Sequence, residues 1–201
     1  MNFIKRDALL ILAGIMLLAL EFTVSVGNIR IDVFSDILAY ILIIVGLAQL
    51  IRRNNIFRKC RSTAIKGLLV AVLAQAVYCV PSAGGNIILF AKGLATIFFI
   101  YFTYYFTEAV ALEAKMQDKA AVSRNFRITW GVFGVFIFAY YIILNFNFGD
   151  MVPIIVQAVL VMSAVYYCYT MSGACSRLYM EGLPPHSEEA LEKSLEKPSK
   201  Q

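Results

Sequence analysis

The chain has 201 residues, of which 60% are hydrophobic and only 15% are charged, and its formal net charge at pH 7 is +5. Soluble domains have about 45–50% apolar and about 25% charged residues. The composition therefore excludes an ordinary soluble domain, a disordered chain and a disulfide-rich scaffold, and it indicates an integral membrane protein.

Six apolar stretches follow one another along the chain, each long enough to cross about 30 Å of hydrocarbon as a helix. Backbone groups in hydrocarbon must pair within their own segment, so each stretch is predicted to be helical. The expected spans are residues 8–26, 33–51, 63–80, 87–112, 128–147 and 154–176. We predict an all-α bundle of six transmembrane helices, arranged as three helical hairpins over residues 1–180, and a flexible tail over residues 181–201.

Basic residues near the span ends predict the orientation, because cytoplasmic loops are enriched in Lys and Arg. All of the 18 basic residues except Arg30 and Lys92 fall on one side of the predicted bundle. We therefore expect a multi-pass protein of the cytoplasmic membrane with both termini in the cytoplasm.

The basic segment after the second span is a candidate for contact with anionic lipid headgroups, and Ile56 and Phe57 are expected to dip into the interface. Its basic members are Arg52, Arg53, Arg58, Lys59 and Arg61. The segment is too short, and lacks an accompanying fold, to predict nucleic-acid binding.

Ionisable side chains within spans are costly and are therefore functional candidates. The acids and the lysine of this kind all fall near the outer face, where tyrosines lie at similar depth. The predicted pocket for a ligand or ion consists of Glu21, Asp32, Asp36, Lys92, Tyr40 and Tyr78. A purely structural alternative stays open: Asp36 caps a helix start, Glu21 meets water, and Lys92 extends outward to the membrane surface.

Aromatic and small residues predict packing rather than chemistry. Seven of the nine residues from Phe98 to Phe106 are Phe or Tyr, which we interpret as an interfacial belt with helix packing, or alternatively as the wall of a ligand site. Small residues predict close helix contacts, within the bundle or with a partner, at Gly67, Ala71, Gly131, Gly134 and Ser172 to Ala174. Glu108 is expected to pair with the basic loop that follows it.

Chemistry-bearing motifs are sparse. The four cysteines form no C-x-x-C pair, and the one histidine, His186, cannot complete a zinc site with them. We expect no metal and no cofactor. No nucleophile–base pair falls at membrane depth, so no enzymatic activity is expected.

The stretch IRIDVFSDILAYILIIVGL, from Ile29 to Leu47, resembles a signature of small, uncharacterised multi-span membrane proteins of Gram-positive, clostridia-type bacteria. There an I-D turn precedes D-x-I/L-x-Y-I-L-I-x-x-G-L. The basic segment and the aromatic span leading into Glu108 and Glu113 are similar too. Ser35 stands where many of those proteins have proline before the aspartate. The resemblance implies a fold and a membrane location, and it carries no activity.

Six spans with both ends inside are also similar, more loosely, to the substrate-binding membrane subunits of energy-coupling-factor vitamin transporters. Those subunits dock through A-x-x-x-A in span one, a spacing that Ala8, Ala13, Gly14 and Ala19 do not reproduce. The expected function is a non-enzymatic binding or accessory protein that acts through membrane partners or as a homo-oligomer. The alternative is a small-molecule transporter or substrate-capture subunit with an outward-facing polar pocket.

Overall fold

The computed structural model describes residues 3–20, 23–26, 29–32, 36–80, 85–117, 119–145 and 151–179. Within them the chain forms six helices and one two-stranded antiparallel hairpin. The elements are α1 (Phe3–Ala19), β1 (Thr23–Val26), β2 (Ile29–Asp32), α2 (Asp36–Leu50), α3 (Asn55–Tyr78), α4 (Gly85–Met116), α5 (Ala120–Asn145) and α6 (Met151–Tyr179). The expected tail lies outside the described residues.

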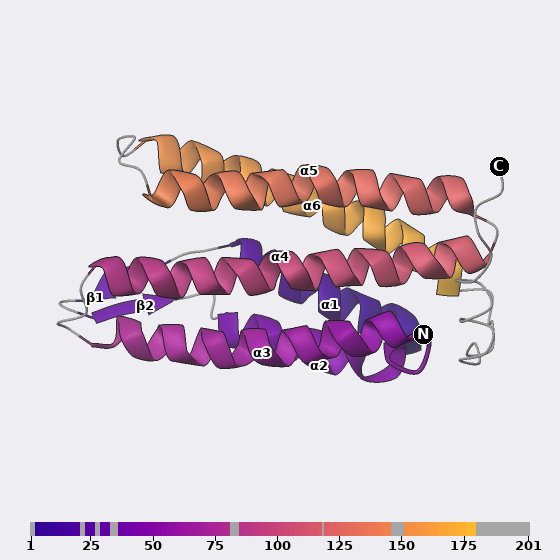
Figure 1. The fold of residues 1–201 in the computed structure, drawn as a ribbon, viewed down its shortest axis with the longest axis horizontal. Helices are drawn as coiled ribbons and strands as arrows, with labels where there is room; N and C mark the ends of the chain where they lie inside the picture. The colour runs from indigo at the N-terminus through magenta and orange to yellow at the C-terminus, as the bar shows by residue number, and fades with distance from the viewer. Residues whose placement is uncertain are drawn as a thin grey trace.

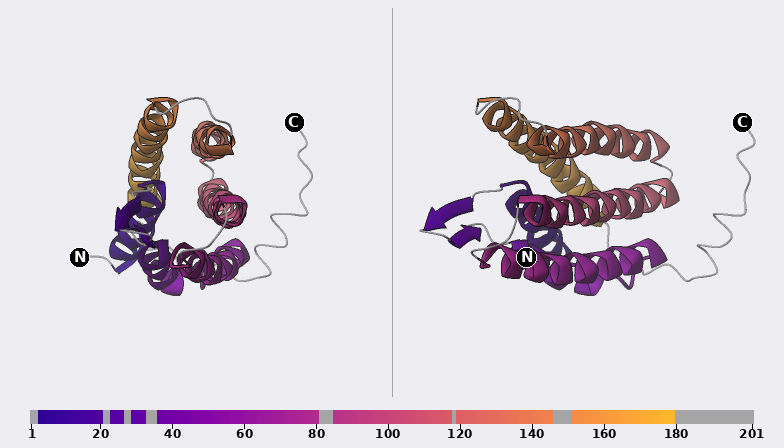
Figure 2. Two further views of the ribbon diagram at one scale, coloured as in Figure 1. Left: turned by 90° about the vertical axis from the view of Figure 1, so that its left-hand side faces the viewer. Right: turned by 60° about the vertical axis from the view of Figure 1, so that its left-hand side comes forward.

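Successive helices run in opposite directions (Figure 1), and the six form a ring that follows the order of the chain. Each helix packs mainly against its neighbours in sequence, and α6 packs against α1, which closes the ring (Figure 2). The α2–α3 and α4–α5 connections therefore share one end with the start of α1 and the end of α6. We call it the basic end, and the opposite end, which carries β1 and β2, the hairpin end.

Helix length separates the ring into two parts. The helices from α3 to α6 contain segments long and apolar enough to cross a membrane. In contrast, α1 and α2 have 17 and 15 residues, which at 1.5 Å per residue rise only about 26 and about 22 Å. Large apolar side chains on the outside of the long helices, including Leu73, Phe90, Val135 and Ile154, are exposed. These features are those of a membrane protein.

The prediction that the first span extends to residue 26 is wrong. Helix α1 ends at Ala19, and residues Thr23 to Val26 form β1, in which Val26 pairs with Ile29 of β2. The sequence carries a signal for this hairpin, because the dipeptide Gly27-Asn28 separates two short runs rich in β-branched residues. The high hydropathy of the region conceals that signal.

The third predicted span begins too late. Helix α3 starts at Asn55 because Asn54 caps it: the Asn54 side-chain oxygen accepts a hydrogen bond from the backbone N–H of Phe57 at 3.1 Å. Phe57 is fully buried against Phe106, with 6.3 Å between ring centroids. Its expected insertion into the lipid interface is therefore wrong. Because α3 starts at Asn55, the Phe57 side chain lies on a helix and points into the core.

Aromatic residues of α4 divide between the inside and the outside of the ring. Phe99, Phe102 and Phe106 are buried, whereas Tyr101 and Tyr104 are exposed. This division agrees with a belt combined with packing, because residues three or four apart share one face of a helix.

Four glycines mark the closest helix approaches. A Cβ at Gly14 or Gly46 would collide with atoms of the facing helix in the α1–α2 pair, one at Gly67 would collide with the ring of Tyr40, and one at Gly93 would collide with the Tyr141 side chain. The close contact expected at Gly67 is thus confirmed. At Gly131 and Gly173 a Cβ would meet open space, so neither position makes a close contact within the described part of the bundle, and the alternative of a contact with a partner stays a prediction.

A central cavity at the hairpin end

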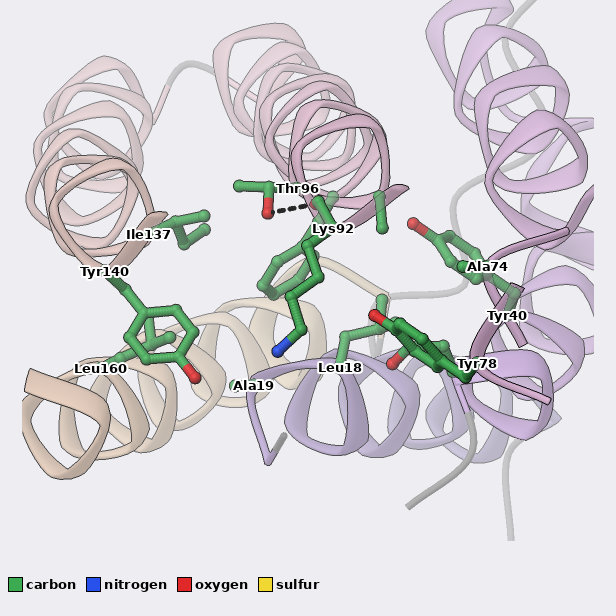
Figure 3. Close-up of a pocket in the computed structure, with 13 residues that line it drawn as sticks. Leu18, Ala19, Tyr40, Ala74, Tyr78, Lys92, Thr96, Ile137, Tyr140 and Leu160 are labelled. Atoms are coloured by element: carbon green, nitrogen blue, oxygen red, sulfur yellow. Dashed lines mark hydrogen bonds between the residues drawn. The ribbon is translucent and has the colours of Figure 1, made fainter. Parts of the chain in front are cut away.

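A cavity of about 70 Å³ lies inside the ring near the hairpin end, and residues of all six helices line it. Leu18 of α1 and Leu160 of α6 give it apolar walls (Figure 3). Its polar members are Asp36, Tyr40, Tyr78, Lys92, Thr96 and Tyr140. Polar side chains from four different helices therefore converge on a space enclosed by the ring.

Four of the six residues predicted for a pocket line this one cavity. They are Asp36 and Tyr40 from α2, Tyr78 from α3 and Lys92 from α4. Asp32 lies in β2, opposite Thr23 in the strand register. Glu21 lies outside the described residues.

Lys92 lies in the second turn of α4, and its side chain extends into the cavity. In Figure 3 it passes between Tyr140 on one side and Tyr40 and Tyr78 on the other. Its backbone carbonyl accepts a hydrogen bond from the Thr96 hydroxyl at 2.9 Å. This placement differs from the structural alternative, in which the lysine turns outward to the membrane surface.

Asp36 combines two arrangements that the sequence leaves as alternatives. It is the first residue of α2, where a carboxylate is stabilised by the positive end of the helix dipole. It also lines the cavity one turn before Tyr40. A helix start therefore fixes a negative charge at the cavity wall.

Tyr40 is the most deeply buried polar group of the cavity, with 1% of its surface exposed. Its ring packs against Gly67, which leaves room for it only because glycine has no side chain. The Tyr40 hydroxyl has no hydrogen-bond partner among the described residues. A buried hydroxyl without a partner is a net cost to the folded state, and this oxygen, packed beside Gly67, is closed to water-sized molecules.

Between the cavity and the basic end, aromatic side chains fill the interior of the helix ring. Phe133 contacts Phe99 edge-on at 5.8 Å between centroids and stacks on Tyr167 at 4.9 Å. The Tyr167 hydroxyl lies 2.8 Å from the hydroxyl of Thr107. We call Phe99, Phe133, Tyr167 and Thr107 the aromatic plug. It begins at Phe99, which lines the central cavity, and extends toward the basic end.

Sequence reasoning missed the walls that α1 and α6 contribute. Leu18 and Leu160 are ordinary apolar residues of their spans, and nothing in their local pattern marks them as pocket residues. Only its depth along the fifth span distinguishes Tyr140. The feature that unites these positions is the closure of the ring by α6 against α1, which is a tertiary contact.

At the basic end, three of the five residues expected to contact headgroups are on the start of α3, and the other two, Arg52 and Arg53, are in the turn that precedes it. Arg58, Lys59 and Arg61 are exposed on the first two turns of α3. The expected pairing of Glu108 with the basic region is confirmed, since its carboxylate accepts a hydrogen bond from the Arg127 guanidinium at 2.7 Å. A further acid, Glu113, is buried and accepts a hydrogen bond from Asn54 at 2.8 Å.

Comparison with known proteins found no matching family model, no matching curated protein and no matching solved structure. Within the described part of the chain, no group of three or more His, Cys, Asp or Glu side chains could hold a metal ion. The four cysteines are free. The features that bear on function are therefore the central cavity and the surfaces of the ring.

Proposed function

We propose that this chain is a non-enzymatic integral protein of the cytoplasmic membrane that captures a small polar or charged ligand in its central cavity. It crosses the membrane six times, with both termini in the cytoplasm and the cavity near the outer face. The observation that carries the proposal is the convergence of Asp36, Lys92 and three tyrosines on one cavity lined by all six helices. Polar groups at membrane depth are costly and are retained where they serve a function.

The charge distribution supports this orientation. The connections at the basic end carry most of the lysines and arginines, as cytoplasmic loops do. The short helices α1 and α2 are compatible with spanning if the bilayer thins locally, at a modest free-energy cost per ångström of mismatch.

Cavity size and charge define the class of ligand. Sites for drug-sized molecules have about 300–1,000 Å³, whereas this cavity has about 70 Å³. It suits an ion or a molecule of a few heavy atoms. Lys92 supplies a positive charge, Asp36 a negative one, and the hydroxyls of Tyr78 and Tyr140 can donate and accept hydrogen bonds.

Purification of the full-length protein in mild detergent, followed by mass spectrometry of co-purifying small molecules and proteins, tests the proposal. The Asp36→Asn/Lys92→Met double variant should lose the bound compound, because both charges that face it are removed. The matched control is Lys66→Met, which neutralises an exposed lysine of α3 outside both the central cavity and the pocket at the basic end, and it should retain the compound. Size-exclusion profiles verify that both variants fold.

Two outcomes separate this proposal from the role of an accessory protein that acts only through membrane partners. Loss of a compound in the cavity variant alone supports ligand capture, and a co-eluting ATPase would place that capture within a transport complex. Recovery of partner proteins with no compound that depends on Asp36 and Lys92 contradicts the proposal and favours the accessory role.

A further inference from the structure

A second cavity of about 320 Å³ lies at the basic end, between the start of α3, the end of α4 and the start of α5. Its polar lining residues are Asn55, Lys59, Glu108, Lys115, Ser123 and Arg127, and we call it the basic cleft. Its volume falls within the range of about 300–1,000 Å³ that is usual for ligand sites.

The basic cleft faces the outside of the ring. Its α4 residues, Glu108, Leu112 and Lys115, recur at spacings of three or four and so share one face of the helix. The buried residues Phe106 and Val110 lie on the opposite face of α4. The cleft is therefore open to the surroundings of the helix ring and is distinct from the central cavity.

The charge of the cleft favours an anion. Lys59, Lys115 and Arg127 supply three positive charges, and Glu108 is the one acid in the described lining. The Glu108 carboxylate takes one hydrogen bond from Arg127, and a guanidinium has five N–H donors in all. Lysine ammonium groups and the arginine fork together bind phosphate oxygens well.

The surface beside the cleft distinguishes a lipid from a soluble anion. The outer face of α4 continues toward the hairpin end through Tyr104, Tyr101 and Ile97, which are 39%, 53% and 48% exposed. Tyr104 also packs edge-on against Trp130 of α5, with 5.0 Å between centroids. Acyl chains attached to a headgroup in the cleft would lie along this apolar and aromatic strip.

We propose that the basic cleft binds the headgroup of an anionic phospholipid of the cytoplasmic leaflet, with its phosphate held by Lys59, Lys115 and Arg127. Basic pockets between membrane helices on the cytoplasmic side are suited to such headgroups. Of the basic residues in the segment after the second predicted span, only Lys59 lines the cleft. The site is therefore a built pocket between three helices and not a diffuse basic surface.

Trp130 is the only tryptophan of the chain and lies one turn from Arg127 on α5, so it reports on this site. The full-length protein is placed in phosphatidylcholine nanodiscs in two series. One series contains increasing fractions of phosphatidylglycerol with brominated acyl chains, and the other contains increasing fractions of phosphatidylcholine with brominated acyl chains. Brominated phosphatidylglycerol should quench Trp130 fluorescence at lower mole fractions than brominated phosphatidylcholine.

Charge removal in and beside the cleft gives the decisive comparison. The preference for phosphatidylglycerol is the ratio of the mole fractions of the two brominated lipids, phosphatidylcholine over phosphatidylglycerol, that give equal quenching. Lys59→Gln/Lys115→Gln should lower this ratio about 25-fold, at about fivefold per basic residue. Arg61→Gln/Arg124→Gln removes two exposed charges from the same end but outside the cleft, and should lower it less than about threefold. Equal losses in the two double variants would show a diffuse attraction and overturn the proposal.

Two further arms complete the test. Glu108→Gln removes a carboxylate that repels the phosphate and should strengthen the preference, so an unchanged or weaker preference contradicts the proposal. Inorganic phosphate at millimolar concentration and constant ionic strength should leave the quenching intact. If it abolishes the quenching by phosphatidylglycerol, the cleft is a site for a soluble anion and the lipid proposal is wrong.

Discussion

The two ends of the helix ring hold cavities of opposite character. The central cavity lies inside the ring, is lined by all six helices and measures about 70 Å³, and Asp36 offsets the charge of Lys92. The basic cleft lies outside the ring between three helices, measures about 320 Å³ and has three cations around one acid. Inside the ring, the opposite charges of Asp36 and Lys92 avoid the cost of burying a net charge. A surface cleft can be large and charged because headgroups and water reach it.

The aromatic plug, inside the ring, and the helix start at Asn54, beside the basic cleft, hold the ring together. Their contacts are buried and specific, so substitutions there should change stability more than substitutions in either cavity. Three substitutions, taken from the largest expected effect to the smallest, sharpen this contrast.

Asn54→Ala should destabilise the protein by about 2–4 kcal/mol. It removes the cap of α3, which contributes about 1 kcal/mol, and the side-chain amide that donates to the buried carboxylate of Glu113 and to the carbonyl of Ala109. The effect is measured as the change in thermal unfolding of the full-length protein in detergent. Asn55→Ala, at an exposed neighbouring position, should change stability by less than about 0.5 kcal/mol. Similar losses in both variants would refute the role of Asn54.

Gly67→Ala should destabilise by about 1–3 kcal/mol, because the new methyl group collides with the Tyr40 ring and displaces it toward the central cavity. Gly131→Ala is the matched control, since a Cβ there meets open space and alanine favours a helix over glycine. Unfolding of the two variants under identical conditions checks the prediction. A destabilised Gly131→Ala with an unaffected Gly67→Ala would contradict the α2–α3 packing.

Tyr40→Phe should have the smallest effect on the stability of the ligand-free protein, within about 0.5 kcal/mol or slightly stabilising. The hydroxyl that it removes is buried without a partner among the described residues, so its loss forfeits no bond and relieves a desolvation cost. The same variant should leave retention of any co-purifying compound unchanged, because the hydroxyl is closed to molecules in the cavity. Tyr101→Phe, on the exposed outer face of α4, should leave both properties unchanged. A destabilisation above about 1 kcal/mol would mean that the Tyr40 hydroxyl is bonded in the folded protein.

Local features of the sequence account for most of the fold. Hydropathy locates all six helices, because a stretch that lies in hydrocarbon must form its backbone hydrogen bonds within itself and is therefore helical. Errors fall at helix ends, where short-range chemistry competes with hydropathy. The prediction of a helix over β1 fails because Val24 and Val26 are as apolar as the preceding turn, and the predicted start of α3 is late because its first two turns are basic rather than apolar.

The candidate residues can be found partly from the sequence. A lysine or an aspartate within an apolar span carries a free-energy cost of insertion into the membrane, so hydropathy is enough to identify Asp36 and Lys92 as candidates. Lys115 and Arg127 cannot be assigned to a common site in this way, because both resemble ordinary loop charges. They lie twelve residues apart in the chain and meet Lys59 only through the packing of α3 and α5 on either side of α4.

Composition, the lengths of apolar stretches and the placement of basic residues are local properties, and they are sufficient to predict a membrane protein, the number of helices and the end at which basic residues gather. The tertiary structure was needed to show that the helices close into a ring, that Tyr40, Tyr78 and Lys92 from three helices share one cavity, and that Phe57 lies in the core. The physical reason is that such contacts depend on which face each helix turns to its neighbours, as at Gly67, where a missing side chain admits a ring from α2.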